Sequence, residues 1–354
     1  MQRKLTREVQ IGTVRIGGSH PVAIQSMTNT ATADAAATAE QIARLAAAGC
    51  DIVRVAVPDM ESARALSEIK KRISIPLVAD IHFDWRLALA AVEAGVDKIR
   101  LNPGNIGSAA RVRAVADACA ERGIPIRIGV NGGSLEKELL EKYGGVTPAA
   151  MCESAEGHIR LLQDCGFDNI CVSMKSSDVG MTIAANLAFS EKYDYPLHIG
   201  VTETGSPRIG MLKSAAGAGS LLALGVGDTI RVSLTDDPVA EIAAARDILR
   251  AADRCETGIN LVSCPTCART RFALIDTVRA LEERLAPMKC RLTVAVMGCE
   301  VNGPGEAREA DIGVAGAGRG EAVIFRRGEI LRRIREADII PEILREIEKI
   351  TQEA

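Results

Sequence analysis

The sequence is poor in aromatic residues and has no long apolar run. Aromatic side chains make up 3% of the 354 residues, so Ala, Val, Ile and Leu must build the core. No segment approaches the roughly 18 consecutive apolar residues of a membrane-spanning helix, and residues 1–8 lack the apolar stretch of a secretory signal peptide. We therefore expect a cytoplasmic protein with no membrane association.

The chain also lacks an excess of charge of either sign. Its formal net charge is −3, from 43 Lys and Arg residues against 46 Asp and Glu residues. Nucleic-acid-binding domains usually carry a basic surface, so this balance argues against a nucleic-acid partner and requires any anion site to be built locally. With 47% hydrophobic residues, the chain is long enough to bury a large core and to form two domains.

Cysteine, in contrast, is plentiful, with ten residues. So many thiols in a chain without a targeting segment indicate a reducing compartment and metal binding. Cys264 and Cys267 are two residues apart, and the 31 residues 268–298 separate them from Cys299, which lies in a Gly- and Pro-rich loop. We expect a helix and a strand in that interval. Seven others have no ligand spacing and are predicted to be structural: Cys50, Cys119, Cys152, Cys165, Cys171, Cys255 and Cys290.

Three thiolates leave one position open on a zinc ion, or one iron without a protein ligand on a [4Fe–4S] cluster. The sequence offers no second cysteine pair, and all four histidines lie upstream of residue 200. The nearest further ligand is Glu306, at the end of the same loop as Cys299. We favour an iron–sulfur cluster, while structural zinc and cysteines without a metal remain alternatives.

Residues 21–253 contain an internal repeat of two alternating strand types. Four segments share a small-residue, Gly, Asp and apolar pattern, namely residues 48–56, 94–102, 165–173 and 227–233. Four begin with proline, namely residues 21–25, 76–80, 125–129 and 196–200. Ala-rich amphipathic segments separate them, including residues 38–48, 85–94, 109–122 and 238–252. Eight strand–helix units predict an α/β fold, with a (β/α)8 TIM-type barrel over residues 1–253 and a smaller α+β iron–sulfur domain over 254–354.

Two further segments are assigned from composition. Residues 132–145 form a longer connection than the repeat requires, either a lid over the barrel or a solvated loop. Residues 326–353 carry Ile and Leu at helical spacing among many charges, so an amphipathic helix is predicted there.

Strand phase predicts where the chemistry lies, because alternate side chains of a strand face opposite sides. One face is apolar and should pack on the outer helices, while the other carries polar groups toward the carboxyl ends of the strands, where barrel active sites are built. The polar set comprises Arg54, Asp80, His82, Arg100, Asn102, Arg127, Asn131, Lys175, Arg231 and Ser233. Five cations in one mouth suit an anion, and the arginine fork suits phosphate. Alternatively, each arginine extends into solvent or pairs with Asp80 or Glu203.

Several motifs together resemble a known family. They are Cys264-Pro265-Thr266-Cys267, Met297-Gly298-Cys299, Asn302-Gly303-Pro304-Gly305-Glu306, and the upstream segments 25–30, 79–83, 101–105 and 200–203. Over essentially its whole length, the chain resembles the bacterial two-domain 4-hydroxy-3-methylbut-2-en-1-yl diphosphate synthases. One departure is Ala268, where the family usually has Gly. If this position requires a positive φ, the alanine would be strained there.

The resemblance implies reductive ring opening and dehydration of 2-C-methyl-D-erythritol 2,4-cyclodiphosphate to (E)-4-hydroxy-3-methylbut-2-enyl diphosphate. It further implies a [4Fe–4S] cluster held by Cys264, Cys267, Cys299 and Glu306, with Glu203 as the catalytic acid near the reacting carbon. Reduced flavodoxin or ferredoxin would supply the electrons. In the family, the cluster domain of one subunit covers the barrel of another in a head-to-tail homodimer.

Two other classes of function fit part of the sequence. One is a barrel lyase or transferase acting on a phosphorylated substrate, such as a pterin-pathway enzyme, with a structural zinc domain attached. The other is a zinc-stabilised interaction module without enzymatic activity. Metal analysis distinguishes both from an iron–sulfur enzyme.

Overall fold

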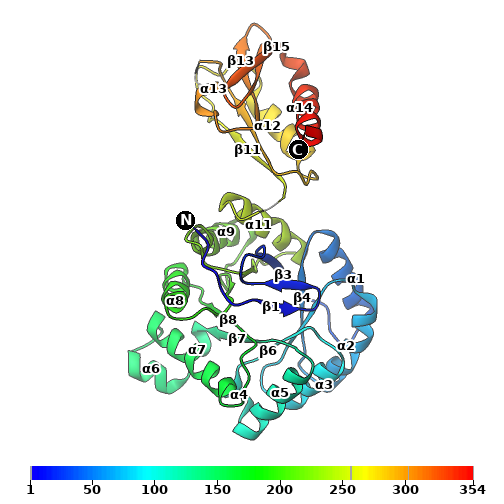
Figure 1. Ribbon diagram of the computed structural model, residues 1–354, viewed down its shortest axis with the longest axis vertical. Coiled ribbons are helices and arrows are strands. Elements are labelled where there is room, and N and C mark those ends of the chain that lie inside the picture. The colour runs from blue at the N-terminus through cyan, green and yellow to red at the C-terminus, as the bar shows by residue number, and fades with distance from the viewer. Residues whose placement is uncertain (1, 256, 302, 354) are drawn as a thin grey trace. The chain divides into compact units, whose positions relative to one another are not determined.

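The chain forms two compact units, residues 1–255 and 256–354 (Figure 1). The computed structural model describes residues 2–255, 257–301 and 303–353, but not the side chains of Pro304 and Glu306. The predicted division after residue 253 falls two residues from this split. None of the described helices combines the length and the apolar character needed to cross a bilayer.

The first unit is a ring of eight parallel strands in the order β8-β7-β6-β5-β4-β3-β10-β9. A bridge between Val172 and Leu197 joins β8 to β9 and completes the ring. The predicted TIM-type barrel is therefore confirmed. The strands are β3 (Ala23–Met27), β4 (Ile52–Ala56), β5 (Leu77–Asp80), β6 (Lys98–Arg100), β7 (Ile126–Asn131), β8 (Ile170–Lys175), β9 (His198–Ile199) and β10 (Thr229–Ile230).

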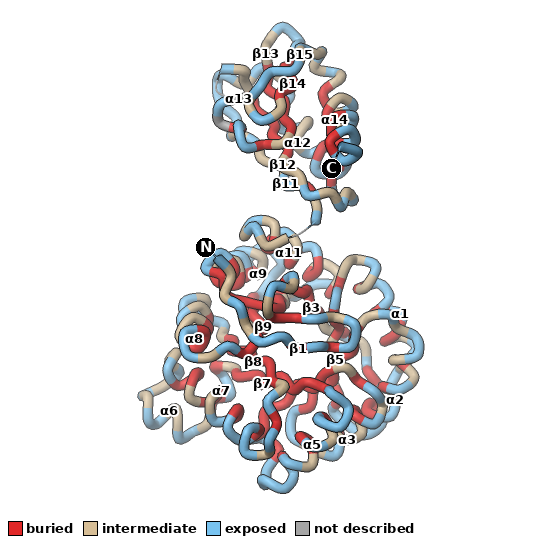
Figure 2. Tube along the Cα trace, in the orientation of Figure 1, coloured by how far each residue is buried: buried red, intermediate tan, exposed pale blue. Residues whose placement is uncertain are grey.

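Helices surround this ring, with their buried faces toward the strands (Figures 1 and 2). Several begin at a side chain that accepts a backbone N–H of the first turn, as Asp34, Asp59 and Asp178 do. The segment predicted as a long loop contains η1 and α6. The helices are α1 (Ala35–Ala47), α2 (Met60–Arg72), α3 (Trp85–Glu93), α4 (Pro103–Ile106), α5 (Ala109–Glu121), η1 (Gly132–Ser134), α6 (Lys137–Tyr143), α7 (Pro148–Gln163), α8 (Val179–Lys192), α9 (Pro207–Ser214), the π-helical η2 (Ala215–Gly219), α10 (Ser220–Ala223) and α11 (Pro238–Ala251).

The strand phase agrees with the predicted one. Val53, Val55 and Leu77 belong to the large apolar cluster between strands and helices. Residues of opposite phase, such as Ile52 and Val78, belong to a separate cluster inside the barrel. The polar residues that follow them by two positions, including Arg54 and Asp80, are thereby placed inside the barrel nearer its carboxyl end.

An N-terminal hairpin, which we did not predict from the sequence, closes the other end of the barrel. Its strands β1 (Val9–Ile11) and β2 (Val14–Ile16) pair antiparallel and cross the barrel (Figure 1). Their apolar side chains join the interior cluster of Ile52 and Val78. Gly12 turns the hairpin at a φ of 55°, where a Cβ atom would approach Asp97 Oδ1 to 2.7 Å.

The second unit is a five-stranded sheet in the order β11-β12-β13-β14-β15. The first three strands are parallel and the last two are antiparallel to their neighbours. Helices α12 and α14 supply buried residues to the larger of its two apolar clusters. The elements are β11 (Ile259–Ser263), α12 (Leu274–Leu285), β12 (Leu292–Met297), α13 (Gly303–Glu306), β13 (Ile312–Gly318), β14 (Glu321–Arg326), β15 (Glu329–Arg335), η3 (Glu336–Asp338) and α14 (Ile339–Glu353).

The helix and strand expected between the two cysteine loops are α12 and β12. The prediction of one amphipathic helix over residues 326–353 was wrong in its first part. Residues Glu329–Arg335 form the edge strand β15, paired antiparallel with β14. Their apolar spacing suits a helix, but the exposed edge of β14 offers backbone hydrogen bonds that a helix here would leave unmade.

Candidate active site

A cavity of about 170 Å³ opens within the barrel and is lined almost entirely by polar side chains. Nine of the ten residues predicted for substrate binding line it: Arg54, Asp80, His82, Arg100, Arg127, Asn131, Lys175, Arg231 and Ser233. They come from the carboxyl ends of strands and the loops that follow. The fold thus brings residues that are far apart in the sequence into one basic mouth, on the inner face that the strand phase predicted.

Asp80 is the carboxylate between two of these cations. Its Oδ2 lies 3.6 Å from Arg54 Nε, and its Oδ1 lies 3.2 Å from Arg100 Nη1. Burial alone would raise the pKa of Asp80, but the charges of Arg54 and Arg100 outweigh it and hold this pKa below its ordinary value. Asp80 therefore orients both guanidinium groups as a fixed anion.

Arg127 has no such partner. Its side chain is buried, and its Nε and Nη2 have no hydrogen-bond partner among the described residues. Burial, followed by the nearby charges of Arg54 and Arg100, lowers the pKa of Arg127 well below its ordinary value. A buried guanidinium with unused donors is costly, so an anionic ligand at this position would relieve an unfavourable arrangement.

Lys175 contacts a histidine, His198, that does not line the cavity. Lys175 Nζ lies 3.3 Å from His198 Nε2, and His198 Nδ1 lies 2.7 Å from Thr229 Oγ1. Burial lowers the pKa of both Lys175 and His198 well below their ordinary values, and the surrounding cations act in the same direction. The mouth thus contains more positive charge than the folded chain can neutralise by itself.

Asn102, the tenth predicted residue, is not among those lining the cavity. Its Nδ2 donates to the carbonyl oxygen of Gly129 at 2.9 Å, and its Oδ1 accepts the N–H of Gly129 at 2.8 Å. Gly129 itself lines the mouth, and a Cβ atom there would lie 2.6 Å from Arg100 Nε. Asn102 therefore fixes the backbone against which Arg100 packs.

Other residues of the mouth were missing from the predicted set. Ser173 and Thr202 also line it, and a signal existed for Ser173, which has the same strand phase as Lys175 two residues later. Glu241, from α11, is buried and lies 3.5 Å from Arg231 Nη2. Its other oxygen accepts from Ser26 Oγ at 3.0 Å. No sequence signal identified Glu241, because its position depends on how α11 packs against the strands.

Glu203, the predicted catalytic acid, lines an adjoining cavity of about 540 Å³. The two cavities share Asn131 and Thr202. The backbone of Glu203 adopts a φ of 54°, an uncommon and strained conformation for a residue other than glycine. Such strain accompanies functional positions often enough to keep Glu203 as a candidate.

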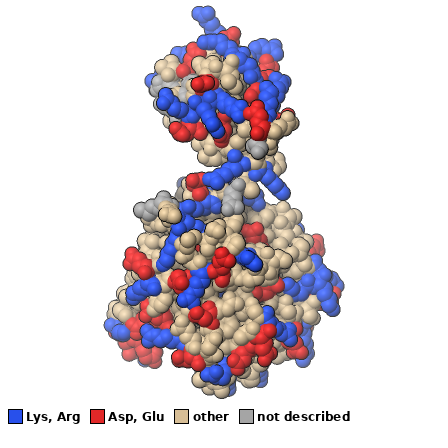
Figure 3. All heavy atoms as spheres, viewed as in Figure 1, with Lys and Arg blue, Asp and Glu red and all other residues tan. Residues whose placement is uncertain are grey.

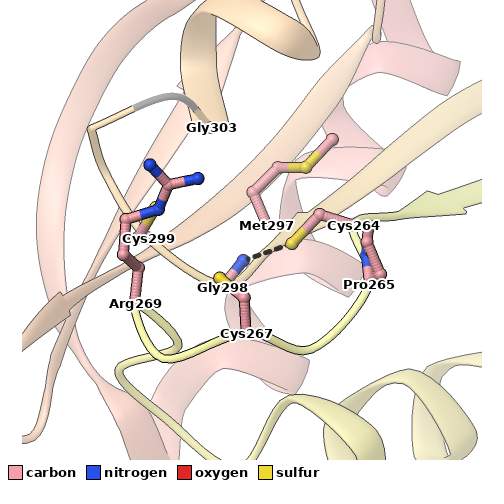
Figure 4. Close-up of a pocket in the computed structure, with 8 residues that line it drawn as sticks. All are labelled: Cys264, Pro265, Cys267, Arg269, Met297, Gly298, Cys299 and Gly303. Carbon is pink, nitrogen blue, oxygen red and sulfur yellow. Dashed lines mark hydrogen bonds between the residues drawn. The ribbon is translucent and has the colours of Figure 1, made fainter.

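The three predicted cysteine ligands line a separate cavity of about 180 Å³ in the second unit (Figure 4). Cys264 and Cys267 follow β11, and Cys299 follows β12. The N–H of Gly298 donates to Cys264 Sγ at 3.0 Å. A hydrogen bond from the backbone N–H of Arg269 lowers the pKa of the Cys267 thiol. The contact to Cys267 favours the thiolate form that binds metal.

These residues fit an iron–sulfur cluster in their donor chemistry, because three thiols and N–H···S contacts surround one cavity. Among the described side chains, no three from His, Cys, Asp or Glu are gathered closely enough to bind a single metal ion. The side chain of Glu306, the predicted fourth ligand, lies outside what the structure describes. Ala268 is not among the residues with positive φ, so replacing the family's usual glycine causes no backbone strain there.

The cysteines predicted to be structural have no ligand arrangement in the described chain. Cys50, Cys119, Cys152 and Cys171 are buried. Burial raises the pKa of Cys50 and Cys119 to about 12, and that of Cys152 and Cys171 to about 11. Such thiols remain protonated and pack as small apolar groups.

Lys98 provides a test of the buried charge in the barrel. It is fully buried, and its Nζ lies 3.3 Å from Gln25 Oε1. Burial lowers the pKa of Lys98 to about 7, opposed by Cys171 and reinforced by Arg127 and Arg54. An unfolded lysine has a pKa of about 10.4. Between about pH 7 and pH 10, Lys98 is therefore protonated in the unfolded chain but largely deprotonated in the folded one. Because the unfolded chain binds more protons, Lys98 makes the free energy of unfolding rise with pH in this range.

We expect Lys98→Met to raise the free energy of unfolding of the barrel at pH 7 by about 1–4 kcal/mol. The gap between variant and wild type should shrink from pH 7 to pH 9, as measured by urea unfolding at each pH. Lys71→Met, at an exposed helical lysine, is the matched control and should change neither quantity. A gap that is constant with pH would contradict the assignment.

The comparisons with known proteins cover both units. A family model described as the GcpE TIM-barrel domain matches residues 6–246, and one described as the GcpE protein C-terminal domain matches residues 260–349. A relative from Caldanaerobacter subterraneus subsp. tengcongensis is 56% identical over 351 residues, covering 99% of each chain. One from Geobacter sulfurreducens is 56% identical over 348 residues, covering 98% of each chain. Both relatives are named 4-hydroxy-3-methylbut-2-en-1-yl diphosphate synthase (flavodoxin).

Among solved structures, a dihydropteroate synthase from Stenotrophomonas maltophilia resembles part of the chain with a TM-score of 0.49 and 16% identity. The match covers 71% of this chain and 100% of that one. A likeness at this level carries no argument about function. The alternative of a barrel lyase or transferase with a zinc domain is not favoured by the full-length relatives.

Proposed function

Because the chain belongs to the GcpE family of 4-hydroxy-3-methylbut-2-en-1-yl diphosphate synthases, we propose that it catalyses the reductive ring opening and dehydration of 2-C-methyl-D-erythritol 2,4-cyclodiphosphate. The product is (E)-4-hydroxy-3-methylbut-2-enyl diphosphate, an intermediate of isoprenoid biosynthesis by the methylerythritol phosphate route. The chain is thus an oxidoreductase. The single observation that carries this function is the full-length identity of 56% to relatives of that name.

The barrel mouth is proposed as the diphosphate site. Arg54, Arg100, Arg127, Lys175 and Arg231 all line one small cavity. Their donors can hold the phosphate oxygens, and the same charges stabilise the anion that is released when the phosphate ring opens. His82, Asn131 and Ser233 line the same cavity and can orient the hydroxyl groups of the sugar-like carbon chain. Asn102 acts indirectly, through Gly129.

Cys264, Cys267 and Cys299 are proposed to hold a [4Fe–4S] cluster, with Glu306 as the fourth ligand. Such a cluster would supply the two electrons of the reaction one at a time. Gly298 donates its N–H to Cys264 Sγ, and the N–H of Arg269 favours the thiolate of Cys267. A carboxylate is a harder and more easily displaced ligand than a thiolate, so Glu306 would be the weakest held of the four ligands.

Glu203 is proposed as the acid that protonates the leaving hydroxyl, so that it departs as water. The support is its place beside the mouth, in a cavity that shares Asn131 and Thr202 with it. Flavodoxin, which appears in the names of the relatives, is proposed as the electron donor, with ferredoxin as the other possibility the resemblance implies. A homodimer is proposed on the family resemblance alone.

Anaerobic purification tests this function directly. We expect about four iron and about four acid-labile sulfide per chain, with no stoichiometric zinc. With reduced flavodoxin, the protein should convert the cyclic diphosphate to the open-chain diphosphate, measured by phosphorus NMR. Iron-free protein containing one zinc per chain, with no conversion, would contradict the proposal.

A further inference from the structure

A second hollow in the C-terminal unit adjoins the cysteine site. It has a volume of about 600 Å³ and shares only Cys299 with the cavity lined by all three cysteines. Arg271, Val301 and Arg319 line it beside the glycine-rich end of β13. Cys299 therefore separates two surfaces, and nothing in the proposed reaction so far uses the second one.

Arg319 occupies a strained position in this hollow. It is the centre of the turn between β13 and β14, with a φ of 57°, and it lies between Gly318 at 82° and Gly320 at 77°. A glycine or asparagine would adopt this conformation at less cost, so the turn alone does not explain an arginine. Arg327 has a similar φ of 50° in the next hairpin turn, so the strain alone assigns no role; what distinguishes Arg319 is that it lines the same hollow as the proposed cluster ligand Cys299.

The two arginines of the hollow also lack partners within the chain. In the part of the chain that the structure describes, no carboxylate pairs with the side chain of Arg271 or Arg319. Glu300 also lines the hollow, but its carboxylate lies 3.1 Å from Arg333, which in turn lies 3.6 Å from Glu321. Both Arg271 and Arg319 are exposed, and basic side chains are prominent on the face of this unit seen in Figure 3. Their charge is available to an external acidic group.

An exposed apolar residue completes the surface. Val301 is 76% exposed, the highest value among the large apolar side chains described. An exposed apolar residue together with unpaired cations is typical of a small, transient protein interface. In such an interface the charges steer the encounter, and the partner protein covers the apolar side chain.

We propose that the hollow formed by Arg271, Val301 and Arg319 is the docking surface for the electron-donating flavodoxin, which engages it through carboxylates around its flavin. This inference rests on the proposed function, because it requires a redox centre at Cys299. Substrate must reach the cysteine pocket itself, so a donor that approaches past Cys299 from the second hollow does not compete with it. The unpaired charges of Arg271 and Arg319 favour an acidic protein as the partner rather than a second copy of this chain.

The test is a charge reversal, Arg271→Glu with Arg319→Asp, in the cluster-containing enzyme. Aspartate tolerates the left-handed backbone at position 319 better than glutamate does. We expect the affinity for oxidised flavodoxin, measured by calorimetry, to fall at least about tenfold and to become less sensitive to salt. Iron content and turnover driven by dithionite, a small reductant that needs no docking site, should be unchanged.

Two comparisons sharpen the result. Arg279→Glu reverses one charge at an exposed position of α12, away from the hollow lining, and should leave flavodoxin affinity unchanged. Arg271→Gln with Arg319→Asn removes charge without adding any and should give an intermediate loss, which guards against a folding defect in the reversed variant.

Unchanged flavodoxin affinity in both double variants would overturn the proposal. A parallel loss of dithionite-driven turnover would also overturn it, because the arginines would then serve the cluster or substrate. A change in oligomeric state on sedimentation would instead assign the surface to contacts between copies of the chain. If the proposed function itself were wrong, wild-type protein would show no turnover with either reductant.

Discussion

Replacing Cys299 with serine should give a folded protein that purifies without a cluster and has no measurable turnover. Cys299 is the only cysteine on its loop, and Cys264 and Cys267 come from the other loop of the same cavity. A hydroxyl group is a poor ligand for iron in place of a thiolate, so two ligands from one loop would have to hold the cluster. Iron and sulfide analysis and the visible absorption of anaerobic protein measure the loss.

Cys290→Ser is the matched control, because Cys290 lies in the same unit but packs against its apolar cluster. That variant should retain iron and activity. Glu306→Ala should behave differently from either, forming a cluster that is lost more readily and supports little turnover, since a displaceable carboxylate is removed and the thiolates remain. Full activity in Glu306→Ala would remove Glu306 from the ligand set, and a stable cluster in Cys299→Ser would refute the cysteine assignment.

Replacing Arg127 with methionine should weaken binding of the cyclic diphosphate and, at the same time, leave the barrel equally or more stable. Arg127 is buried with two unpartnered nitrogens. Removing a charge-assisted contact to phosphate should cost about 1.5–3 kcal/mol, or roughly ten- to a hundredfold in affinity. Removing an uncompensated buried charge should cost the free protein nothing.

Affinity can be measured by calorimetry, and stability by urea unfolding without ligand. Arg64→Met, at an exposed arginine of α2, is the control and should alter neither quantity. Cluster absorption should be the same in all three proteins. If Arg127→Met instead loses stability and keeps its affinity, Arg127 is a structural residue with partners that the chain itself provides, and the anion site must lie elsewhere in the mouth.

The sequence predicted the barrel well because its signals are local and repeated. A strand such as Ile52–Ala56 shows its phase through the contrast of Val53 and Val55 with Arg54, and the next repeat shows the same contrast. The N-terminal hairpin had a local signal as well, since Val9, Ile11, Val14 and Ile16 alternate around a turn at Gly12. That signal was missed because the hairpin lies outside the repeat.

Other features could not be predicted, because they depend on contacts between distant segments. The edge strand β15 has apolar residues at helical spacing, and only its pairing with β14 decides its structure. The position of Glu241 beside Arg231 depends on the packing of α11. Asn102 has the strand phase of a mouth residue, but its amide pairs with the backbone of Gly129, which no alternation pattern shows.

The N-terminal hairpin has a consequence for the order in which the protein can be made. Val9, Ile11 and Ile16 are buried against a cluster that extends to Cys171, and the backbone N–H of Lys4 bonds to the carbonyl oxygen of Gly225. On the ribosome, residues 4–16 emerge long before residues 171 and 225. The contacts of this segment with Ile52 and Val78 can form early, but those with Cys171 and Gly225 can form only after β8 and the residues before β10 have been synthesised. Contacts of such sequence separation slow folding, so the base of this barrel should seal only after most of the unit has been synthesised.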